Sequence, residues 1–489
     1  MATIRLQEII IGSKERSKEI GKLERGGLLR KIAPKIYTSN LEEAPSVIIR
    51  RNWYRLLADL YPEAMLSHRS ALERMPTPEG GHIFLTYTYT ENIELPGLTI
   101  HLLKGNVPLE DDLPFFGSLR ASSLARAYLE NLQPSRGAGE GVKTLSREAL
   151  EEKIESYLRS KGDKGLNEVR DRAKAIAPML GMDKECKLLN QLITDILGTG
   201  FSKNLVSPVA KARVLGEPFD PDRISLFESL YGELVKMDFP DYPDRNENIK
   251  SYQCFAFFEG YFSNYIEGTE FTVDEAKQII TTATPLPARD EDSHDVLGTY
   301  QIVSNRKEMA ILPENADHFL ELLRERHGIL LAARITKSPG VFKDRNNRAG
   351  VTEFVDWQLV SGTLKKGYEL YSMLQHPFAR AAYMMFIVSE VHPFIDGNGR
   401  IARVMMNAEL GAHGLSKIII PTVYREDYMG TIKKLTKQRE GNAYIRMLLK
   451  AWDFSRNVYD DNLNSMEQYL IECNAFLAPK DGYLKIIPR

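Results

Sequence analysis

The chain of 489 residues is long enough for about two or three domains, and its 43% hydrophobic residues suffice for packed cores. Its formal net charge of −2 says nothing about partners, and its three scattered cysteines form neither a disulfide framework nor a zinc-ligand pattern. No apolar run is long enough to span a membrane, and the first residues lack the pattern of a secretory signal. We therefore expect a cytoplasmic protein.

Residues 1–40 are basic, with nine Lys and Arg against four Asp and Glu. A helix is expected through Ile20 and Leu23, followed by two short strands around a Pro-containing turn in residues 26–37. A helix followed by a basic β-wing is typical of some nucleic-acid-binding elements. A solvated basic face on a protein-binding module fits the same pattern, because charge clusters alone are weakly specific.

The rest of the N-terminal half is expected to be α+β. Apolar and β-branched runs between about residues 83 and 103 predict strands, and residues 145–197 predict three helices. The runs RGGLLRKIAPKIYTSN and LSHRSALE, with the helical tail ending at Leu197, resemble AbiEi-like antitoxin regions of abortive-infection systems. That resemblance implies a domain over residues 1–200, with a winged-helix-like element at about 1–40 that contacts DNA.

Residues 201–241 are expected to form a linker to a second domain, because several prolines interrupt them. The second domain is expected over residues 242–457. Residues 458–489 are left as a C-terminal tail without an assigned role.

The most informative stretch is HPFIDGNGRIAR, residues 392–403. An apolar helix is expected before it, and helical periodicity resumes through Leu410. Gly397 and Gly399 allow close approach of the backbone to a ligand, and free N–H groups at the start of the second helix form an anion site. The pattern predicts a helix, an abrupt loop and a second helix that binds phosphate.

Four side chains in this stretch carry suitable chemistry. Arg400 and Arg403 lie three residues apart, so both guanidinium groups can reach one polyphosphate. Asp396 supplies a hard oxygen ligand for Mg²⁺, and the ordinary pKa of His392 suits a general base.

The stretch fills every fixed position of the signature H-x-F-x-[D/E]-G-N-G-R-x-x-R and therefore resembles the Fic family. This implies a mostly α-helical Fic fold with a β-hairpin flap, and ATP and Mg²⁺ as substrate and metal. His392 would accept the proton of a Tyr, Thr or Ser hydroxyl on a target protein, which then receives AMP. The resemblance implies these nucleotide-binding residues: Gly397, Asn398, Gly399, Arg400, Arg403, Tyr428 and Asn407.

The resemblance extends over about residues 242–457. The run PGVFKDRNNRAGV, residues 339–351, is similar to the family's flap, and its Asn-Asn and Ala-Gly pairs suit a hairpin. Expected partners are a target protein and, as candidates, DNA and a second copy of the chain. The flap residues expected to bind the target are Arg345, Asn346, Asn347 and Val351.

The run SNYIEG, residues 263–268, matches the family's inhibitory motif [S/T]-x-x-x-E-[G/N], as does TKQREG at residues 436–441. We favour the first match because it leads into a capped helix upstream of the catalytic stretch. The resemblance then implies an inhibitory helix with Ser263 and Glu267, in which Glu267 pairs with Arg403 and blocks the γ-phosphate. Alternatively, Glu267 is an ordinary surface carboxylate at a helix end.

Three other functions stay open. The same residues could remove AMP from a modified protein, with Glu267 orienting the attacking water. A nucleotide other than ATP could be the donor. The chain could also be chiefly a DNA-binding autoregulator whose second half is silent.

Overall fold

The computed structural model describes residues 6–106, 108–137, 139–198, 204–287, 289–350 and 352–489. The chain divides into two compact units, Met1–Leu215 and Gly216–Arg489. Each unit is described by itself. None of the helices within the described ranges combines the length and apolarity needed to cross a membrane.

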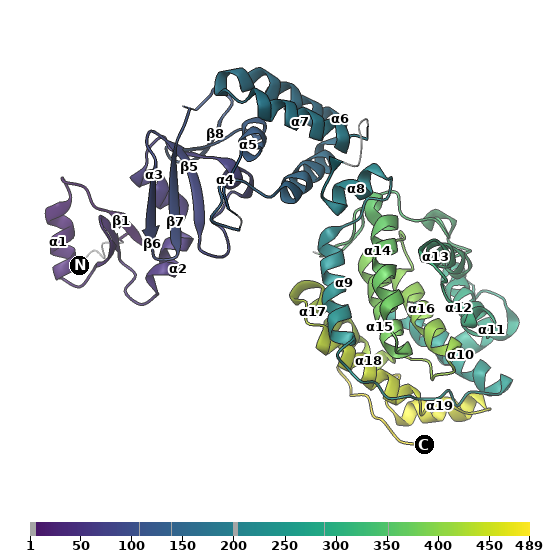
Figure 1. Ribbon diagram of the computed structural model, residues 1–489. Helices are drawn as coiled ribbons and strands as arrows, with labels where there is room; N and C mark the ends of the chain where they lie inside the picture. Colours follow the sequence, from purple (N-terminus) through teal and green to yellow (C-terminus); the bar gives the residue numbers. More distant parts are fainter. Residues whose placement is uncertain (1–5, 107, 138, 199–203, 288, 351) are drawn as a thin grey trace. The chain divides into compact units, whose positions relative to one another are not determined.

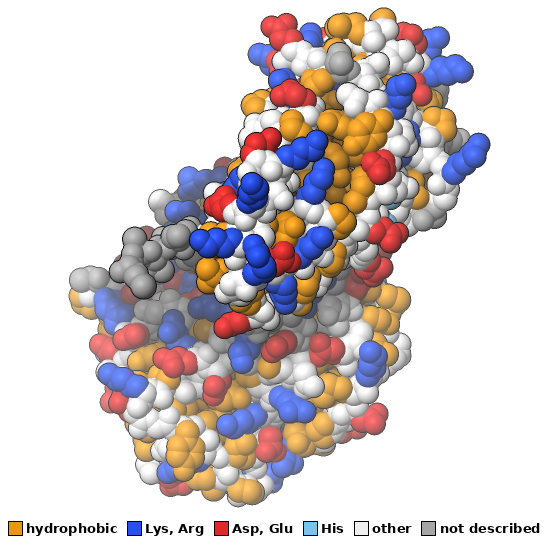
Figure 2. All heavy atoms as spheres, turned by 90° about the vertical axis from the view of Figure 1, so that its left-hand side faces the viewer, with side chains coloured by type: hydrophobic (Ala, Val, Ile, Leu, Met, Phe, Trp, Pro, Cys, Tyr) orange, Lys and Arg blue, Asp and Glu red, His pale blue; other side chains and the backbone are white. Residues whose placement is uncertain are grey.

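The N-terminal unit begins with a small sheet next to one helix. Strands β1 (Ile9–Ile11), β2 (Arg30–Ala33) and β3 (Ile36–Thr38) are antiparallel in the order β1-β3-β2, and helix α1 (Ser17–Arg25) precedes the β2–β3 hairpin. Helix α1 buries only Ile20, so its Lys and Arg side chains are exposed. On the face that carries these elements, Lys and Arg side chains lie close together with Asp and Glu between them (Figure 2).

A six-stranded mixed sheet follows, in the order β6-β7-β5-β4-β9-β8. Its apolar face packs against helices α2 and α3, which bury Ile48, Ile49, Leu56 and Leu57. The α+β prediction for this half is therefore confirmed. The elements are α2 (Pro45–Arg51), α3 (Trp53–Leu60), β4 (Met65–Leu66), α4 (His68–Glu73), β5 (His82–Tyr87), β6 (Glu91–Leu95), β7 (Leu98–Lys104), β8 (Leu113–Phe116), β9 (Leu119–Ala121) and α5 (Leu124–Asn131).

Helices α6 (Arg147–Leu180) and α7 (Asp183–Ile196) complete most of this unit and pack on α5. Gly162 has a φ of 69° inside α6, so the chain leaves the helical conformation there. Two helical segments of α6 together with α7 account for the three helices expected in residues 145–197.

The interval 201–241, expected as a linker, contains two helices, α8 (Pro208–Val214) and α9 (Pro221–Leu234). The division between the units falls inside the interval, after Leu215. Pro208 and Pro221 each stand at the start of a helix, where a missing N–H costs nothing, rather than interrupting one. Helix α9 buries four apolar side chains in the core of the C-terminal unit and belongs to it.

The C-terminal unit is mostly helical, as expected, and its long apolar helix α15 lies in the middle of it, beside α14 and α16 (Figure 1). Twelve of the fifteen residues of α15 are buried. The helices are α10 (Ile249–Ile266), α11 (Val273–Thr282), α12 (Asp290–Val303), α13 (Ala316–Leu330), α14 (Val360–Met373), α15 (Pro377–Val391), α16 (Asn398–Ala412), α17 (Arg425–Gln438), α18 (Gly441–Ser455) and α19 (Leu463–Glu472).

Two smaller parts complete this unit. Near the end of the predicted flap, β10 (Arg348–Ala349) pairs in a short hairpin with β11 (Thr352–Glu353), which follows the predicted range. The expected tail after residue 458 is not separate from the domain, because α19 buries Met466, Tyr469 and Leu470 in the same core.

Candidate active site

The turn between α15 and α16 adopts two left-handed backbone conformations. His392 ends α15 with a φ of 53°, and Gly397 precedes α16 with a φ of 74°. The Asn398 side chain closes the loop between them, since its Oδ1 accepts the Phe394 N–H at 2.8 Å and its Nδ2 donates to the Phe394 carbonyl at 2.9 Å. Asn398 therefore shapes the turn, and its predicted contact with the nucleotide stays a prediction.

The His392 imidazole is held on one face and at one nitrogen. The Phe354 ring, just after β11, stacks on it with centroids 3.7 Å apart. Nδ1 lies 3.3 Å from the Ser389 carbonyl, and because Nδ1–H donates there, Nε2 is left as the basic nitrogen. Burial lowers the pKa of His392 to about 4, so the imidazole is neutral and able to accept a proton near pH 7.

Asp396 lies at the opening of the turn, with 38% of its side chain exposed. Although burial alone would raise it, the pKa of Asp396 is lowered by the hydrogen bond from Gly397 N–H and by the positive charges of Arg400 and Lys337. An ionised, partly exposed carboxylate fits Mg²⁺, which commonly takes one or two carboxylates together with substrate phosphates. Within the described ranges, no three His, Cys, Asp or Glu side chains cluster as a metal site.

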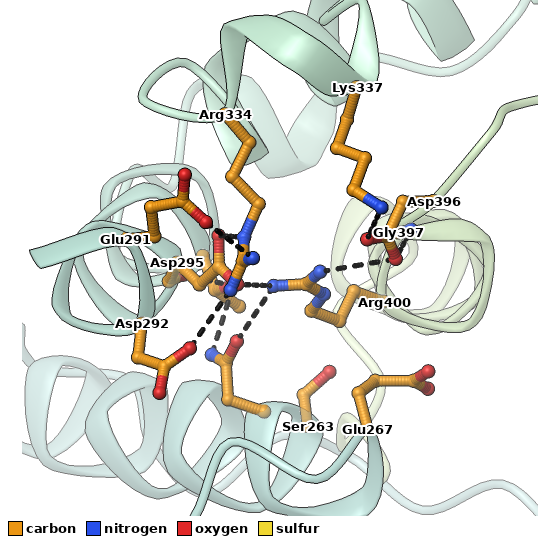
Figure 3. A network of polar contacts seen from close by, with 12 residues as sticks. Ser263, Glu267, Glu291, Asp292, Asp295, Arg334, Lys337, Asp396, Gly397 and Arg400 are labelled. Carbon is orange, nitrogen blue, oxygen red and sulfur yellow. Dashed lines mark hydrogen bonds and ion pairs between the residues drawn. The ribbon is translucent and has the colours of Figure 1, made fainter. Parts of the chain in front are cut away.

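Arg400 is buried and fixed by the neighbouring helix α12. Its Nη1 lies 2.7 Å from Asp295 Oδ2 and 3.3 Å from Asn264 Oδ1 (Figure 3). Its Nε is buried and has no hydrogen-bond partner among the residues that the structure describes. Asp295 thus holds part of the guanidinium group and leaves a donor without a protein acceptor.

Asp295 also belongs to a wider ionic network that the sequence did not predict. Arg334 Nε lies 3.0 and 2.9 Å from the two carboxylate oxygens of Asp295, and its other nitrogens bind Glu291 and Asp292 (Figure 3). The acidic residues at the start of α12 indicate that a cation could bind there, but the sequence does not show that this cation is Arg334.

Arg403 is held on the other side of the turn, by the end of α10. Its Nε donates to Ser263 Oγ at 3.0 Å, and its Nη2 lies 2.8 Å from the Ser263 carbonyl and 2.7 Å from Glu267 Oε1. A Cβ atom built on Gly399 would lie only 2.2 Å from Glu267 Oε1. The Glu267 carboxylate therefore lies over the first turn of α16, where an anion would otherwise bind.

The two remaining nucleotide-binding predictions differ in position. Tyr428 is 2% exposed, and its hydroxyl lies 3.2 Å from Arg403 Nη1, so it contacts the site. Asn407 is buried. Its Nδ2 donates to the Ile418 carbonyl and to Glu259 Oε1, and its Oδ1 accepts the Ile418 N–H. Asn407 lines a small cavity together with Ser263 and Arg403, and its contact with the nucleotide stays a prediction.

The flap residues also separate into two groups. Asn347 Nδ2 donates to the Phe394 carbonyl at 2.9 Å, and Asn346 binds Asp356 and the Trp357 N–H, so both shape the base of the flap. Arg345 is exposed, and Val351 lies outside the described residues.

His327, on α13, is a second histidine at the turn that the sequence analysis missed. Its ring stacks on Phe394 with centroids 3.6 Å apart, and its Nε2 lies 3.0 Å from the Asp396 carbonyl. The Gly340 N–H donates to its Nδ1 at 3.0 Å, so His327 links the turn to the start of the flap. An isolated histidine gives no local signal of such a role.

Comparison with known proteins agrees with this geometry. Residues 318–410 match the model of the Fic/DOC family. A protein adenylyltransferase Fic of Nematostella vectensis is 30% identical over 187 residues, which cover 35% of this chain and 42% of that protein. The corresponding protein of Drosophila persimilis is 26% identical over 212 residues, 42% of this chain and 41% of its own length. The chain thus spans about two fifths of the length of these curated relatives.

Two solved structures are also similar. A Fic domain-containing signalling protein of Bacteroides thetaiotaomicron has a TM-score of 0.38 at 18% identity, over 50% of this chain and 97% of that one. Fic-1 of Caenorhabditis elegans has a TM-score of 0.37 at 17% identity, over 67% and 98%. The residues that match the Fic/DOC family model include the complete signature and lie in the C-terminal unit.

Proposed function

We propose that the protein transfers AMP from ATP to a Tyr, Thr or Ser hydroxyl of a target protein and of itself, and that Glu267 inhibits the reaction. The observation that carries this proposal is the turn between α15 and α16. It combines a neutral imidazole, a helix N-terminus and two buried arginines within one ligand's reach.

Each group has a definite part in the reaction. The Gly399 amide and Arg400 bind the α- and β-phosphates, and Arg403 binds the γ-phosphate. The Gly397 N–H donates to Asp396 Oδ1 at 2.7 Å and would have to leave it to reach a phosphate. Asp396 would hold Mg²⁺, which supplies positive charge to the phosphates when bound. His392 Nε2 accepts the hydroxyl proton while the hydroxyl oxygen bonds to the α-phosphorus, and the bond to pyrophosphate breaks.

Inhibition follows from competition for the same positive groups. Glu267 Oε1 lies 2.7 Å from Arg403 Nη2 and over the start of α16, so a bound γ-phosphate would meet its negative charge. With 33% of its side chain exposed, Glu267 lies where it can move aside without a large desolvation change. ATP binding in a productive pose therefore requires displacement of this carboxylate.

The test is incorporation of label from α-labelled ATP with Mg²⁺ by the full chain. We expect weak self-labelling by the wild type, stronger labelling by Glu267→Gly, and none by Glu267→Gly with His392→Ala. Thermal unfolding of each variant controls for loss of structure. If Glu267→Gly labels no better than wild type, the inhibitory assignment is wrong, and label that persists without His392 would exclude it as the base.

Removal of AMP is a second candidate, supported by the partly exposed position of Glu267 beside the phosphate site. There the Glu267 carboxylate could orient a water molecule toward the α-phosphorus. Labelled Glu267→Gly protein, freed of ATP, would be mixed with unlabelled wild type. Release of labelled AMP by wild type, but not by Glu267→Gln, would support this activity, and retention of all label would exclude it.

DNA contact through the N-terminal unit is a separate candidate. Helix α1 directly precedes the β2–β3 hairpin and exposes Lys18, Lys22 and Arg25. Mobility shifts of the full chain on DNA that includes its own promoter, at two salt concentrations, test this. Contacts with phosphates predict weaker binding at higher salt and after Lys22→Glu. Absence of any shift would end this proposal.

A further inference from the structure

Lys343, at the base of the flap, is a buried cation that the reaction above does not use. It is 3% exposed, and among the residues that the structure describes no carboxylate lies within ion-pair distance of it. Burial lowers the pKa of Lys343 to about 8, with Asp356 opposing that shift and Arg223 adding to it. Because an unpaired buried ammonium is costly, its retention beside a catalytic turn suggests a functional role.

The contacts of Lys343 lie on both sides of His392. Its backbone N–H donates to the Pro393 carbonyl at 2.8 Å, and its Nζ lies 3.5 Å from the Val391 carbonyl. Nζ also donates to Asn347 Oδ1 at 2.7 Å. The Asn347 amide in turn donates to the Phe394 carbonyl at 2.9 Å.

These contacts attach the base of the flap to three carbonyls of the catalytic turn. His392 has a φ of 53°, a conformation that costs a non-glycine residue roughly 1 kcal/mol or more unless its surroundings impose it. The ammonium also lies at the C-terminal end of α15, where positive charge is favourable. Lys343 is therefore placed to impose the conformation that aims the imidazole.

The charge of Lys343 acts on the imidazole as well. Burial is the largest cause of the lowered pKa of His392, and Lys343 is the charged group that lowers it further. Glu267 and Asp396 raise the pKa of His392. The positive charge of Lys343 and the negative charges of Glu267 and Asp396 thus have opposite effects on the pKa of His392. When the nucleotide displaces Glu267, the influence of Lys343 remains.

We propose that Lys343 is a positioning residue for AMP transfer, which holds the backbone on both sides of His392 from the base of the flap. Its positive charge adds to the effect of burial on the imidazole. This inference rests on the proposed function. It links the segment that receives the target to the base that takes the target's proton. Lys343 itself touches neither the nucleotide nor the hydroxyl.

The kinetic test uses Glu267→Gly protein as the parent, with Lys343→Met, Lys343→Gln or Lys343→Arg added. The matched control is Lys366→Met. Lys366 lies on α14 with 41% of its side chain exposed, and within the described residues its one ion pair is with nearby Glu369. We expect Lys343→Met to lower kcat about tenfold or more, with the KM for ATP nearly unchanged, as expected for misplacement of a catalytic group. Lys343→Arg should restore most of kcat, and Lys366→Met should match the parent.

The pH profile separates positioning from simple loss of structure. Removing a nearby positive charge stabilises the imidazolium, so the pKa of His392 rises and the acidic limb of kcat/KM moves to higher pH, by about one unit. Lys343→Gln keeps a hydrogen-bond donor without charge and should show the same displacement. A folded Lys343→Gln with the parent's kcat and acidic limb would overturn the proposal.

A measurement independent of catalysis completes the test. Titration of ring-labelled histidines by NMR, with the His392 signal assigned from its loss in His392→Gln, should show a higher midpoint in Lys343→Gln than in the parent. An unchanged midpoint would overturn the electrostatic part of the proposal. If the parent transfers no AMP but the midpoint moves, the proposed function fails while the influence of Lys343 on His392 stands.

Discussion

Two carboxylates pair with the two arginines of the turn between α15 and α16, and their surroundings differ sharply. Asp295, on α12, is 1% exposed and shared between Arg400 and Arg334. Glu267, at the end of α10, has 33% of its side chain exposed and makes one ion pair, with Arg403. The buried Asp295 carboxylate is not accessible to a ligand and holds Arg400 in place. The partly exposed Glu267 carboxylate occupies the position beside Arg403 where we propose that a phosphate binds. Under the proposed function, the same kind of ion pair would fix an arginine on one side of the turn and control access to the other arginine on the opposite side.

The largest expected effect is that of replacing His392, which pairs with neither Asp295 nor Glu267. If Glu267 controls access only, then chemistry in Glu267→Gly protein still depends fully on His392. Adding His392→Ala should lower kcat/KM for labelling by roughly 10²–10⁴-fold, the usual contribution of a general base. Binding of ATP, measured by its effect on thermal unfolding, should persist. A much smaller loss would assign the proton to another acceptor.

The contrast in burial predicts a contrast in stability. Asp295→Ala leaves the buried Arg400 without its carboxylate and should cost roughly 3–5 kcal/mol of unfolding free energy. Glu267→Gln removes a partly exposed carboxylate from the buried Arg403 but keeps an amide oxygen that can accept from it, and should cost about 1 kcal/mol. Denaturant unfolding of the two variants beside wild type measures both. Equal losses would mean that burial does not distinguish the two carboxylates.

Acidification offers a smaller test at the same turn. The pKa of His392 is about 4 in the folded protein and near 6.5 in an unfolded chain, so only the unfolded state takes up this proton between those values. Stability from this group is present above pH 6.5 and is lost as pH falls toward 4. Between pH 7 and 5, wild type should lose about 2 kcal/mol more than His392→Gln. Parallel pH curves would show that His392 titrates normally.

The smallest expected effect concerns the other support of Arg403. Ser263→Ala removes the hydroxyl that accepts from Arg403 Nε at 3.0 Å but leaves the Ser263 carbonyl and Glu267 in place. We expect a loss of about 1 kcal/mol in stability and labelling close to that of wild type. If Ser263→Ala labelled as strongly as Glu267→Gly, the contact of Arg403 with Ser263, and not its pair with Glu267, would be the inhibitory one.

Much of the site could be predicted because its key residues are local in sequence. The spacing of His392, Asp396, Arg400 and Arg403 around two glycines determined a helix, a turn and a second helix, and the structure has them. The resemblance of SNYIEG to an inhibitory motif placed Glu267 opposite Arg403, where it lies. The prolines of residues 201–241 misled because proline both interrupts helices and begins them.

The sequence by itself therefore determined the α+β character of the first half, the helical character of the second and the identity of the turn. Tertiary structure alone decided that Asp295 pairs with both Arg400 and Arg334, that His327 and Lys343 contact the turn, and that Asn407 binds the Ile418 backbone. The physical reason is the range of the interactions. Periodicity, turn residues and caps act over a few residues, whereas the partner of a buried charge depends on which distant helices pack together.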